Sequence, residues 1–370
     1  MRTIQTGTLF RTLAIAAVIV ACAATAAAQQ PRVSNAKVET RSGSAGLETA
    51  FRAAVAAQEA PAWIGYGVPM ISGERHMCCA SYSDNDYRAG CCRLESGKGA
   101  NISTSDQGGA AGGTVKLEGR QTMFVLFRVE QKQVQKIRIF SEECALDAGG
   151  LPFIWLSEVR PAESVALLTS FVKGADFDGR GNHLGNNALT AIVFHADPAS
   201  DRALESFTAA DQPEALRRQT AFWLGNARGK FGLAALKRMA RQDPSEHVRD
   251  QVTFALSQSR EPEAVDEMIC MAREDSSPHV RGQALFWLGQ KAGKKAEAAI
   301  TDAIANDPDT TIKKKAVFAL SQLPHDQGVP LLIQVARTNT NPAVRKDAMF
   351  WLGQSRDPRA LDFFEEILKK

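Results

Sequence analysis

Five cysteines close together in the first half of the chain are the residues best able to do chemistry. They are Cys78, Cys79, Cys91, Cys92 and Cys144, with Cys22 and Cys270 outside this group. Such thiols either cross-link a small domain or, together with His76, bind a metal. Zinc sites favour cysteines separated by two to four residues and a reducing compartment. Here four of the cysteines form two pairs of sequence neighbours, 78 with 79 and 91 with 92. We therefore expect disulfides rather than a metal site.

The spacing of these cysteines leaves their connectivity open. Neighbouring cysteines rarely bond to each other, so we expect the pair at 78 and 79 to bridge to the pair at 91 and 92. Cys144 is an alternative partner for one of them, and one thiol of the five stays free. Cross-links of this kind stabilise a small secreted domain that has a limited apolar core.

The elements around the cysteines are predicted to be mainly β. Apolar and polar residues alternate over 123–129, and the chain returns over 134–140 across a polar turn, which is a hairpin pattern. Residues 63–68 and 114–117 are candidate partner strands. Apolar residues at helical spacing predict a short helix before Pro61 and a second helix over 161–173. The leader at 29–46, rich in glycine, serine and charge, is expected to be flexible.

The last part of the chain repeats itself at one fixed interval, without an insertion. Each unit begins with an aliphatic residue, and these are Leu216, Val248, Val280, Ile312 and Val344. Six residues later comes a phenylalanine each time, at Phe222, Phe254, Phe286, Phe318 and Phe350. A leucine and then a glycine or serine end this first helix, and a second apolar helix follows. Each unit is therefore a two-helix hairpin, which has to stack on its neighbours to bury its apolar face.

A doubled period overlies this short one. Tryptophan follows the phenylalanine in alternate units, and alanine takes its place between them. The residues are Trp223, Ala255, Trp287, Ala319 and Trp351. A large ring beside a methyl group in successive layers fills a stacked core without voids. We expect these tryptophans to be core residues.

The units share a further pattern. An acidic residue is followed six residues later by Val-Arg, and then by Ala, Leu and Gly. This pattern resembles the short HEAT-like repeat of the phycobilisome-lyase type. The resemblance covers about residues 188–370 and implies a right-handed solenoid with a ladder of hydrogen bonds between stacked loops. The ladder positions are Asp211, Arg217, Asp243, Arg249, Asp275, Arg281, Asp307, Lys313 and Arg345, with Asn339 at the last acidic position. Lys313 and Asn339 weaken it, because neither supplies a bidentate partner.

Some HEAT-repeat proteins are enzymes, and deoxyhypusine hydroxylase carries His-Glu pairs in successive repeats. Here His195, His247 and His279 are followed by Ala or Val, and we expect them to be solvated residues in turns. The loop around Asp176 resembles a calcium loop only in its first half, because Arg180 stands where a ligand oxygen is needed. No nucleophile elbow is present. We therefore predict no catalytic, cofactor or metal site.

Residues 1–28 have the pattern of a secretory signal. Arg2 and Arg11 precede an apolar run, and alanines precede Gln29. A lipobox-like sequence ending at Cys22 is an alternative, which would make the protein an outer-membrane lipoprotein. We favour plain cleavage because the alanines fit the small-residue rule, and we expect an exported protein of the periplasm or cell envelope.

Charge and length narrow the class of partner. The net charge is +3, and removal of the two arginines in the signal leaves a nearly neutral chain, which argues against nucleic-acid binding. No later stretch is long enough to cross a membrane. The predicted order is a signal at 1–28, a leader and short helix at 29–60, a cysteine-rich β domain at 61–160, a connector at 161–187 and repeats at 188–370. The fold class is α+β.

The phenylalanine ladder is the predicted partner-binding surface. At about 100° per residue, the rings fall opposite the core positions of the first helix, among mostly polar neighbours. A stacked apolar stripe with polar flanks marks an interaction site. The alternative is that the rings lean sideways and seal adjacent repeats. We predict a non-catalytic scaffold for a protein partner. The competing prediction is an exported redox or metal sensor that uses the cysteine domain, with the solenoid as docking arm.

Overall fold

The structure is a computed structural model that describes residues 30–71, 77–78, 80–83, 86–89, 92–95, 122–177, 183–291 and 293–369. The signal, the candidate strand at 114–117 and the residues Cys22, His76, Cys79, Cys91 and Arg180 lie outside the described residues. The description therefore covers most of the sheet domain and nearly the whole helical array.

A five-stranded sheet forms the centre of the first domain, with strand order β2-β10-β3-β7-β8. Its strands are β2 (Val38–Ser42), β10 (Phe153–Ser157), β3 (Ala62–Pro69), β7 (Thr122–Glu130) and β8 (Gln133–Ser141). β10 runs parallel to β2 and β3, and the other pairs are antiparallel. In the hairpin between β7 and β8, Gln131 and Lys132 both adopt positive φ, the backbone of a tight two-residue turn. The hairpin and β3 were predicted, whereas β2 comes from the leader that was expected to be flexible.

The two faces of this sheet bury separate apolar clusters. One face is covered by α1 (Leu47–Ala56), α2 (Pro161–Lys173) and α3 (His183–Phe194), with Phe51 and Phe127 in contact at 4.6 Å between ring centroids. The other face buries Trp63, Phe124 and Trp155 beneath a small sheet of β1 (Val33–Ser34), β9 (Leu146–Asp147) and β6 (Cys92–Arg93). A separate hairpin pairs β4 (Ala80–Ser83) with β5 (Asp86–Ala89).

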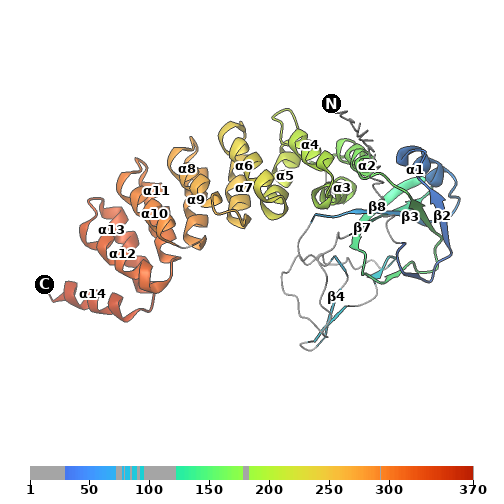
Figure 1. Cartoon of the computed structure of the whole chain (residues 1–370). Coiled ribbons are helices and arrows are strands. Elements are labelled where there is room, and N and C mark those ends of the chain that lie inside the picture. The colour runs from blue at the N-terminus through green and yellow to red at the C-terminus, as the bar shows by residue number, and fades with distance from the viewer. Residues whose placement is uncertain are drawn as a thin grey trace, which may run out of the picture.

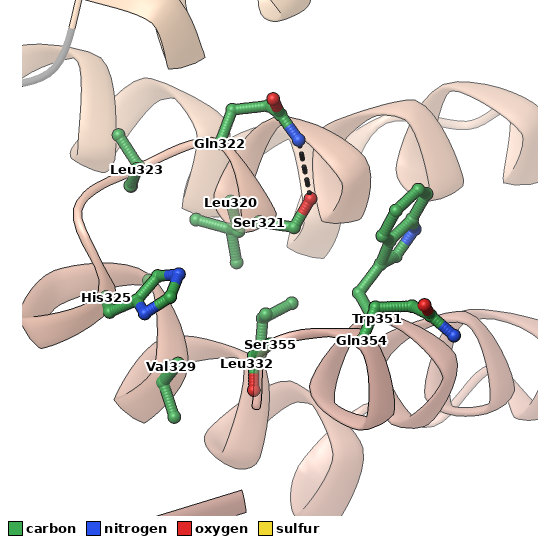
Figure 2. Close-up of a pocket in the computed structure, with 11 residues that line it drawn as sticks. Leu320, Ser321, Gln322, Leu323, His325, Val329, Leu332, Trp351, Gln354 and Ser355 are labelled. Atoms are coloured by element: carbon green, nitrogen blue, oxygen red, sulfur yellow. Dashed lines mark hydrogen bonds between the residues drawn. The ribbon is translucent and has the colours of Figure 1, made fainter. Parts of the chain in front are cut away.

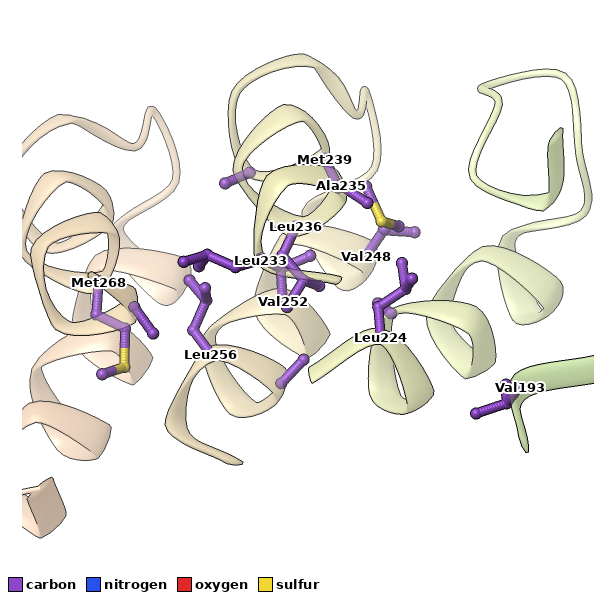
Figure 3. Close-up of a cluster of buried hydrophobic side chains, with 14 of the residues drawn as sticks. Val193, Leu224, Leu233, Ala235, Leu236, Met239, Val248, Val252, Leu256 and Met268 are labelled. Atoms are coloured by element: carbon purple, nitrogen blue, oxygen red, sulfur yellow. The ribbon is translucent and has the colours of Figure 1, made fainter. Parts of the chain in front are cut away.

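The remaining helices follow one another in a curved row that leads away from the sheet domain (Figure 1). After α4 (Pro198–Phe207) the five hairpins are α5 (Glu214–Ala227) with α6 (Gly229–Gln242), α7 (Glu246–Gln258) with α8 (Ala264–Glu274), α9 (Pro278–Lys291) with α10 (Lys294–Asn306), α11 (Thr310–Ser321) with α12 (His325–Thr338), and α13 (Pro342–Gln354) with α14 (Pro358–Leu368). Buried Leu224, Leu236, Val252 and Leu256 continue the apolar core between hairpins (Figure 3). The predicted α+β class and helical-hairpin array are confirmed. No helix in the described ranges is long and apolar enough to span a membrane.

The doubled period corresponds to two alternating kinds of contact between first helices. A Cβ atom built on Gly225 would lie 2.1 Å from the carbonyl oxygen of Ala255, and one on Gly289 would lie 2.7 Å from that of Ala319. The backbones of α5 and α7, and those of α9 and α11, therefore approach too closely for a larger residue. At the intervening contact a tryptophan inserts instead, since Trp287 lies 5.0 Å from Phe254. This alternation is the large-and-small filling that the sequence predicted.

Candidate protein-binding face

The aromatic rings of the first helices form a continuous ladder along the array. Within α5 and α7, Phe222 stacks on Phe254 at 6.1 Å with ring planes 16° apart. Trp287 bridges from Phe254 to Phe286, which stacks on Phe318 at 6.1 Å. The ladder continues through Trp351 to Phe350, and at its other end it reaches Phe194 through Trp223. Every step of the ladder is a direct ring contact, so the rings link the sheet domain to the last hairpin.

The phenylalanines are neither core residues nor fully exposed. Phe222, Phe254, Phe286 and Phe318 are partly buried, and Phe350 is 55 % exposed. Their flat stacking seals neighbouring repeats, while part of each ring stays accessible to solvent. The two interpretations of the ladder, a surface stripe and a seal between repeats, therefore describe two sides of the same rings.

The tryptophans were expected to be core residues, and that expectation is wrong in part. Trp223, Trp287 and Trp351 are half-buried and pack against the edge of the core. They lie beside the phenylalanines because their position in the first helix borders the apolar stripe instead of standing at its centre. The Nε1 atom of Trp223 is buried and has no hydrogen-bond partner among the described residues.

Two rows of amide side chains flank the rings. The first belongs to the polar neighbours that the sequence predicted, whereas the second was not predicted. One row lies three residues before the ring and the other four residues after it, hence one helical turn away on the same face. The first row is Gln219, Gln251 and Gln283, and the second is Asn226, Gln258, Gln290, Gln322 and Gln354. All members of the second row are exposed. The repeat register that located the phenylalanines also contains this signal.

The amides give this face a neutral hydrogen-bonding character. A primary amide both donates and accepts, as a peptide group does. Neighbouring units are close enough for their amides to meet, since Gln290 Nε2 donates to Gln322 Oε1 at 3.3 Å. We call the aromatic ladder and its two amide rows the amide–phenylalanine face. It offers apolar contact along its centre and peptide-like hydrogen bonds along both sides.

A groove of about 470 Å³ lies where the amide–phenylalanine face meets the sheet domain. Phe177 and Asn186 form one wall, and α5 and α7 contribute the rest. The lining residues are Phe177, Asn186, Ala215, Arg218, Gln219, Phe222, Gln251 and Phe254. Arg218 is exposed and has no carboxylate partner within the described residues. The groove therefore combines three rings, three amides and one available cation.

A smaller cavity of about 180 Å³ lies at the far end of the array, between α11, α12 and α13 (Figure 2). Trp351 and Gln354 line it from α13, while Leu332 and His325 line it from α12. Gln322 donates to Ser321 Oγ at its rim. The lining of this cavity therefore includes one ring of the face, Trp351, and two of its amides, Gln322 and Gln354.

The acidic and basic ladder ties successive hairpins together on their turns. Arg249 Nε lies 2.8 Å from Asp275 Oδ2 and Nη2 lies 3.1 Å from Oδ1, while Nη1 donates to the carbonyl of Asp243. Arg217 and Arg281 reach forward in the same way, to Asp243 and to Asp307. Each arginine thereby joins the turn of its own hairpin to the turn of the next one.

The ladder of arginine and aspartate side chains stops short of both ends of the array. Lys313 donates to the carbonyl of Ala305 at 2.8 Å rather than to Asn339, whose Oδ1 accepts from the Asn341 amide. Asp211 is exposed and receives only a bond from Gln212 at 3.4 Å. It was assigned to the ladder, but the arginine that would reach it from one unit earlier is replaced by Gly185. The arginine–aspartate pairs therefore run only from Arg217 to Asp307.

The cysteine domain contains a disulfide on the sheet face away from the helical array. Cys78 and Cys144 are joined, with their Cα atoms 5.3 Å apart, and Cys92 is disulfide-bonded as well. Cys144 has therefore taken a partner from the pair at 78 and 79, the alternative left open by the spacing. Cys270 is free. No group of three or more His, Cys, Asp or Glu that could hold a metal occurs within the described ranges.

His195 was expected to be a solvated turn residue and is instead fully buried where the two domains join. Its Nε2 lies 2.9 Å from Ser164 Oγ, which donates to the Tyr66 hydroxyl at 2.9 Å. Burial lowers the pKa of His195 to about 4, and the neighbouring Arg228 acts in the same direction. Burial raises the pKa of Tyr66. The arrangement superficially resembles a nucleophile with its base, but all three side chains are inaccessible, so we regard it as structural.

Comparison with known families bears on the helical part of the chain. A family model described as HEAT repeats matches residues 202–289, 265–334 and 297–370. The helical array consists of HEAT repeats. The resemblance inferred from the spacing of acidic and basic residues is thus confirmed, and the sheet domain lies outside all three matches. A HEAT solenoid is an architecture whose extended surface generally serves protein interaction.

Several solved structures are similar to the chain at low identity. Human deoxyhypusine hydroxylase, in complex with glycerol, is 16% identical, covers 56% of this chain and 90% of its own, and has a TM-score of 0.27. The complex of CpcE and CpcF of phycocyanin lyase from Nostoc is 15% identical, with 42% and 98% covered and a TM-score of 0.33. Kap95p, from a structure that concerns its binding to RanGDP, is 20% identical, with 53% and 30% covered and a TM-score of 0.35. No curated protein matches the chain. Similarity at this level says nothing about activity or partner.

Proposed function

We propose that the protein is a non-catalytic scaffold that binds a protein partner along the amide–phenylalanine face. The observation that carries this proposal is the unbroken ladder of half-exposed rings between two rows of amides. Rings that only sealed the repeats would not need amides in register on both sides. An extended polypeptide could place apolar side chains on the rings and hydrogen-bond its backbone to the amides.

Electrostatics supports a protein rather than a nucleic acid as the partner. Gln219, Gln251 and Gln283 carry no charge, and at the equivalent positions of the last two units Lys315 and Asp347 carry opposite charges. Arg218 lines the groove at one end of the face. Phosphate backbones are bound mainly by clustered lysine and arginine side chains. The groove beside Arg218 is the place where an acidic or carboxyl-terminal group of the partner would be held.

Replacing the amides tests the proposal without disturbing the rings. We expect a triple variant, with Gln251→Ala, Gln258→Ala and Gln283→Ala, to unfold at the same temperature as the wild type, because exposed and half-exposed amides contribute little to stability. Capture of the partner from an envelope extract should fall at least about tenfold, which corresponds to about 1.4 kcal/mol.

Glutamines on the second helices provide the matched control. Gln242 on α6 and Gln334 on α12 are exposed and lie outside the ladder. The double variant Gln242→Ala and Gln334→Ala should capture the same species as the wild type. Equal capture by the face variant and the control variant would refute the proposal.

We also propose that the protein is exported. The pattern of residues 1–28 motivates this, and the disulfides at Cys78, Cys144 and Cys92 suit an oxidising compartment. Intact mass of the native protein distinguishes the two modes of processing. A chain that begins at Gln29 supports plain cleavage, a lipid-modified chain that begins at Cys22 supports an outer-membrane lipoprotein, and an unprocessed chain contradicts export.

A further inference from the structure

The first helix of each hairpin is one of two kinds, and the two kinds alternate along the array. The glycine kind carries Phe-Trp-Leu-Gly and comprises α5, α9 and α13, whereas the alanine kind carries Phe-Ala-Leu-Ser and comprises α7 and α11. Each alanine helix covers the preceding glycine helix, α7 on α5 and α11 on α9. In the part of the chain that the structure describes, no alanine helix follows α13.

Three features occur together at each closed contact between a glycine helix and an alanine helix, although the third, the arginine–aspartate pair, is also found between α7 and α9. The backbones approach at the glycine, where an added Cβ at Gly289 would lie 2.7 Å from the Ala319 carbonyl oxygen. The two phenylalanines stack at 6.1 Å. The arginine at the start of the glycine helix binds an aspartate just before the alanine helix, as Arg281 binds Asp307.

At α13 the same three features are present, and none of the described residues lies opposite them. A Cβ built on Gly353 would meet no atom within 4 Å. The Phe350 ring is 55 % exposed, whereas its equivalents are half-buried. Arg345 donates through Nη1 to the carbonyls of Asn339 and Thr340, and the side of its guanidinium that binds aspartate in Arg281 has no carboxylate among the described residues.

The surroundings of Gly353 are apolar and hollow. The large hydrophobic residues that are exposed in the described structure all belong to this hairpin: Phe350, Leu361, Ile367 and Leu368. A cavity of about 430 Å³ opens between α13 and α14, with Gly353, Leu361 and Phe364 among its lining residues. An apolar surface of this kind on a soluble protein marks an interaction site.

We propose that the outer face of α13 and α14 is a docking site for one amphipathic helix of a partner protein. The two closed contacts within the chain specify its chemistry. The helix carries a phenylalanine that stacks on Phe350, an alanine directly after it that rests on Gly353, and an aspartate eleven residues before the phenylalanine that binds Arg345. In this chain Asp243 precedes Phe254, and Asp307 precedes Phe318, by the same interval.

A second copy of the chain does not fit this description. Its own outermost first helix carries Trp351 where a covering helix needs alanine, and an indole cannot approach a glycine backbone as closely as a methyl group does. The two alanine helices that could fit, α7 and α11, are already packed between neighbouring hairpins. A second copy of the described chain is therefore not the occupant.

A synthetic peptide with the sequence of residues 243–258, held helical by a side-chain staple, provides the probe. The staple is needed because an isolated helix of this length is marginal in water. We expect saturable binding of the fluorescein-labelled peptide to the full chain by fluorescence anisotropy. The same peptide with the change Ala255→Trp, or with Asp243→Asn and Phe254→Ala together, should bind at least about tenfold more weakly.

Variants of the full chain locate the binding. Gly353→Val should abolish peptide binding while thermal unfolding is unchanged, because the space beside Gly353 is open, and Arg345→Gln should weaken binding several-fold. Absence of saturable binding at millimolar peptide would overturn the proposal, as would binding that Gly353→Val leaves intact. Dimerisation of the full chain that Gly353→Val abolishes would also overturn it, because a second copy would then be the occupant.

Discussion

Adding one methyl group at equivalent glycines should change stability in opposite directions. Gly225 and Gly353 occupy the same position of their repeats, but a Cβ at Gly225 would lie 2.1 Å from the Ala255 carbonyl oxygen and 2.7 Å from its carbon, whereas Gly353 has nothing within 4 Å. Those distances are shorter than any tolerated contact, and the atoms that would have to move belong to the backbone of α7. Gly225→Ala must therefore push α5 and α7 apart.

The magnitudes follow from two opposing effects. Overpacking a close contact costs about 1–3 kcal/mol. Alanine favours a helix over glycine by up to about 1 kcal/mol. Gly225→Ala should accordingly lower the free energy of unfolding by about 1–2 kcal/mol. Gly353→Ala has only the helix term, which is smaller near the end of α13, and should raise it by a few tenths to about 1 kcal/mol.

Urea unfolding followed by far-UV circular dichroism measures both variants against the wild type. Gly289→Ala is a third point, because its 2.7 Å approach is looser and its effect should fall between the other two. The loss of stability on substitution by alanine should therefore be largest at Gly225, smaller at Gly289 and absent at Gly353. If Gly225→Ala and Gly353→Ala shift the midpoint equally and in the same direction, the close approach of the backbones is not what alternates along the array.

Three further predictions concern the ladder, the buried histidine and the disulfide. Lys313→Arg together with Asn339→Asp should extend the bidentate ladder and stabilise the array by about 1 kcal/mol beyond the sum of the single changes; additive single effects in a double-mutant cycle would contradict this. The pKa of His195 falls from 6.5 to about 4 on folding, so the unfolded chain binds the proton more tightly than the folded chain does. The contribution of His195 to the free energy of unfolding is therefore fully present above pH 6.5, and it is reduced by up to about 3 kcal/mol as the pH drops to 4. His195→Gln should remove that slope in urea titrations at each pH, and an unchanged slope would assign it to other groups. Replacing Cys78 and Cys144 by serine should cost the sheet domain about 2–4 kcal/mol and expose it to protease, while an unchanged digestion pattern would show that the cross-link is dispensable.

The sequence predicted the helical array well because the repeat supplies five parallel observations of each position. The register of Phe222 and its equivalents located every first helix, and the alternation of Trp287 with Ala255 and Ala319 indicated the doubled unit. The degree of burial was harder to predict. An angle on one helix puts Phe254 opposite the core, but the neighbouring helix then covers part of that side, so the ring is half-buried.

Features that depend on distant segments escaped the sequence analysis. β2 pairs with β10 from the far end of the domain, and no local pattern indicates that partner. His195 is buried because Tyr66 and Ser164, from two other elements, supply hydrogen-bonding groups around it. Asp211 matches the ladder pattern in sequence but has no arginine in the unit before it. The repeat register placed Gln219, Gln251 and Gln283 among the polar neighbours of the rings, but the row from Asn226 to Gln354 was not predicted.

Photo-crosslinking from single positions tests the binding face most directly. Benzoylphenylalanine placed at Gln251 or Gln283 lies within the amide–phenylalanine face, and at Gln242 or Gln334 it lies on the second helices. Illumination of the native cells should yield the same cross-linked protein from Gln251 and Gln283 and none from Gln242 or Gln334. The same product from all four positions, or a product from the second helices alone, would contradict the account.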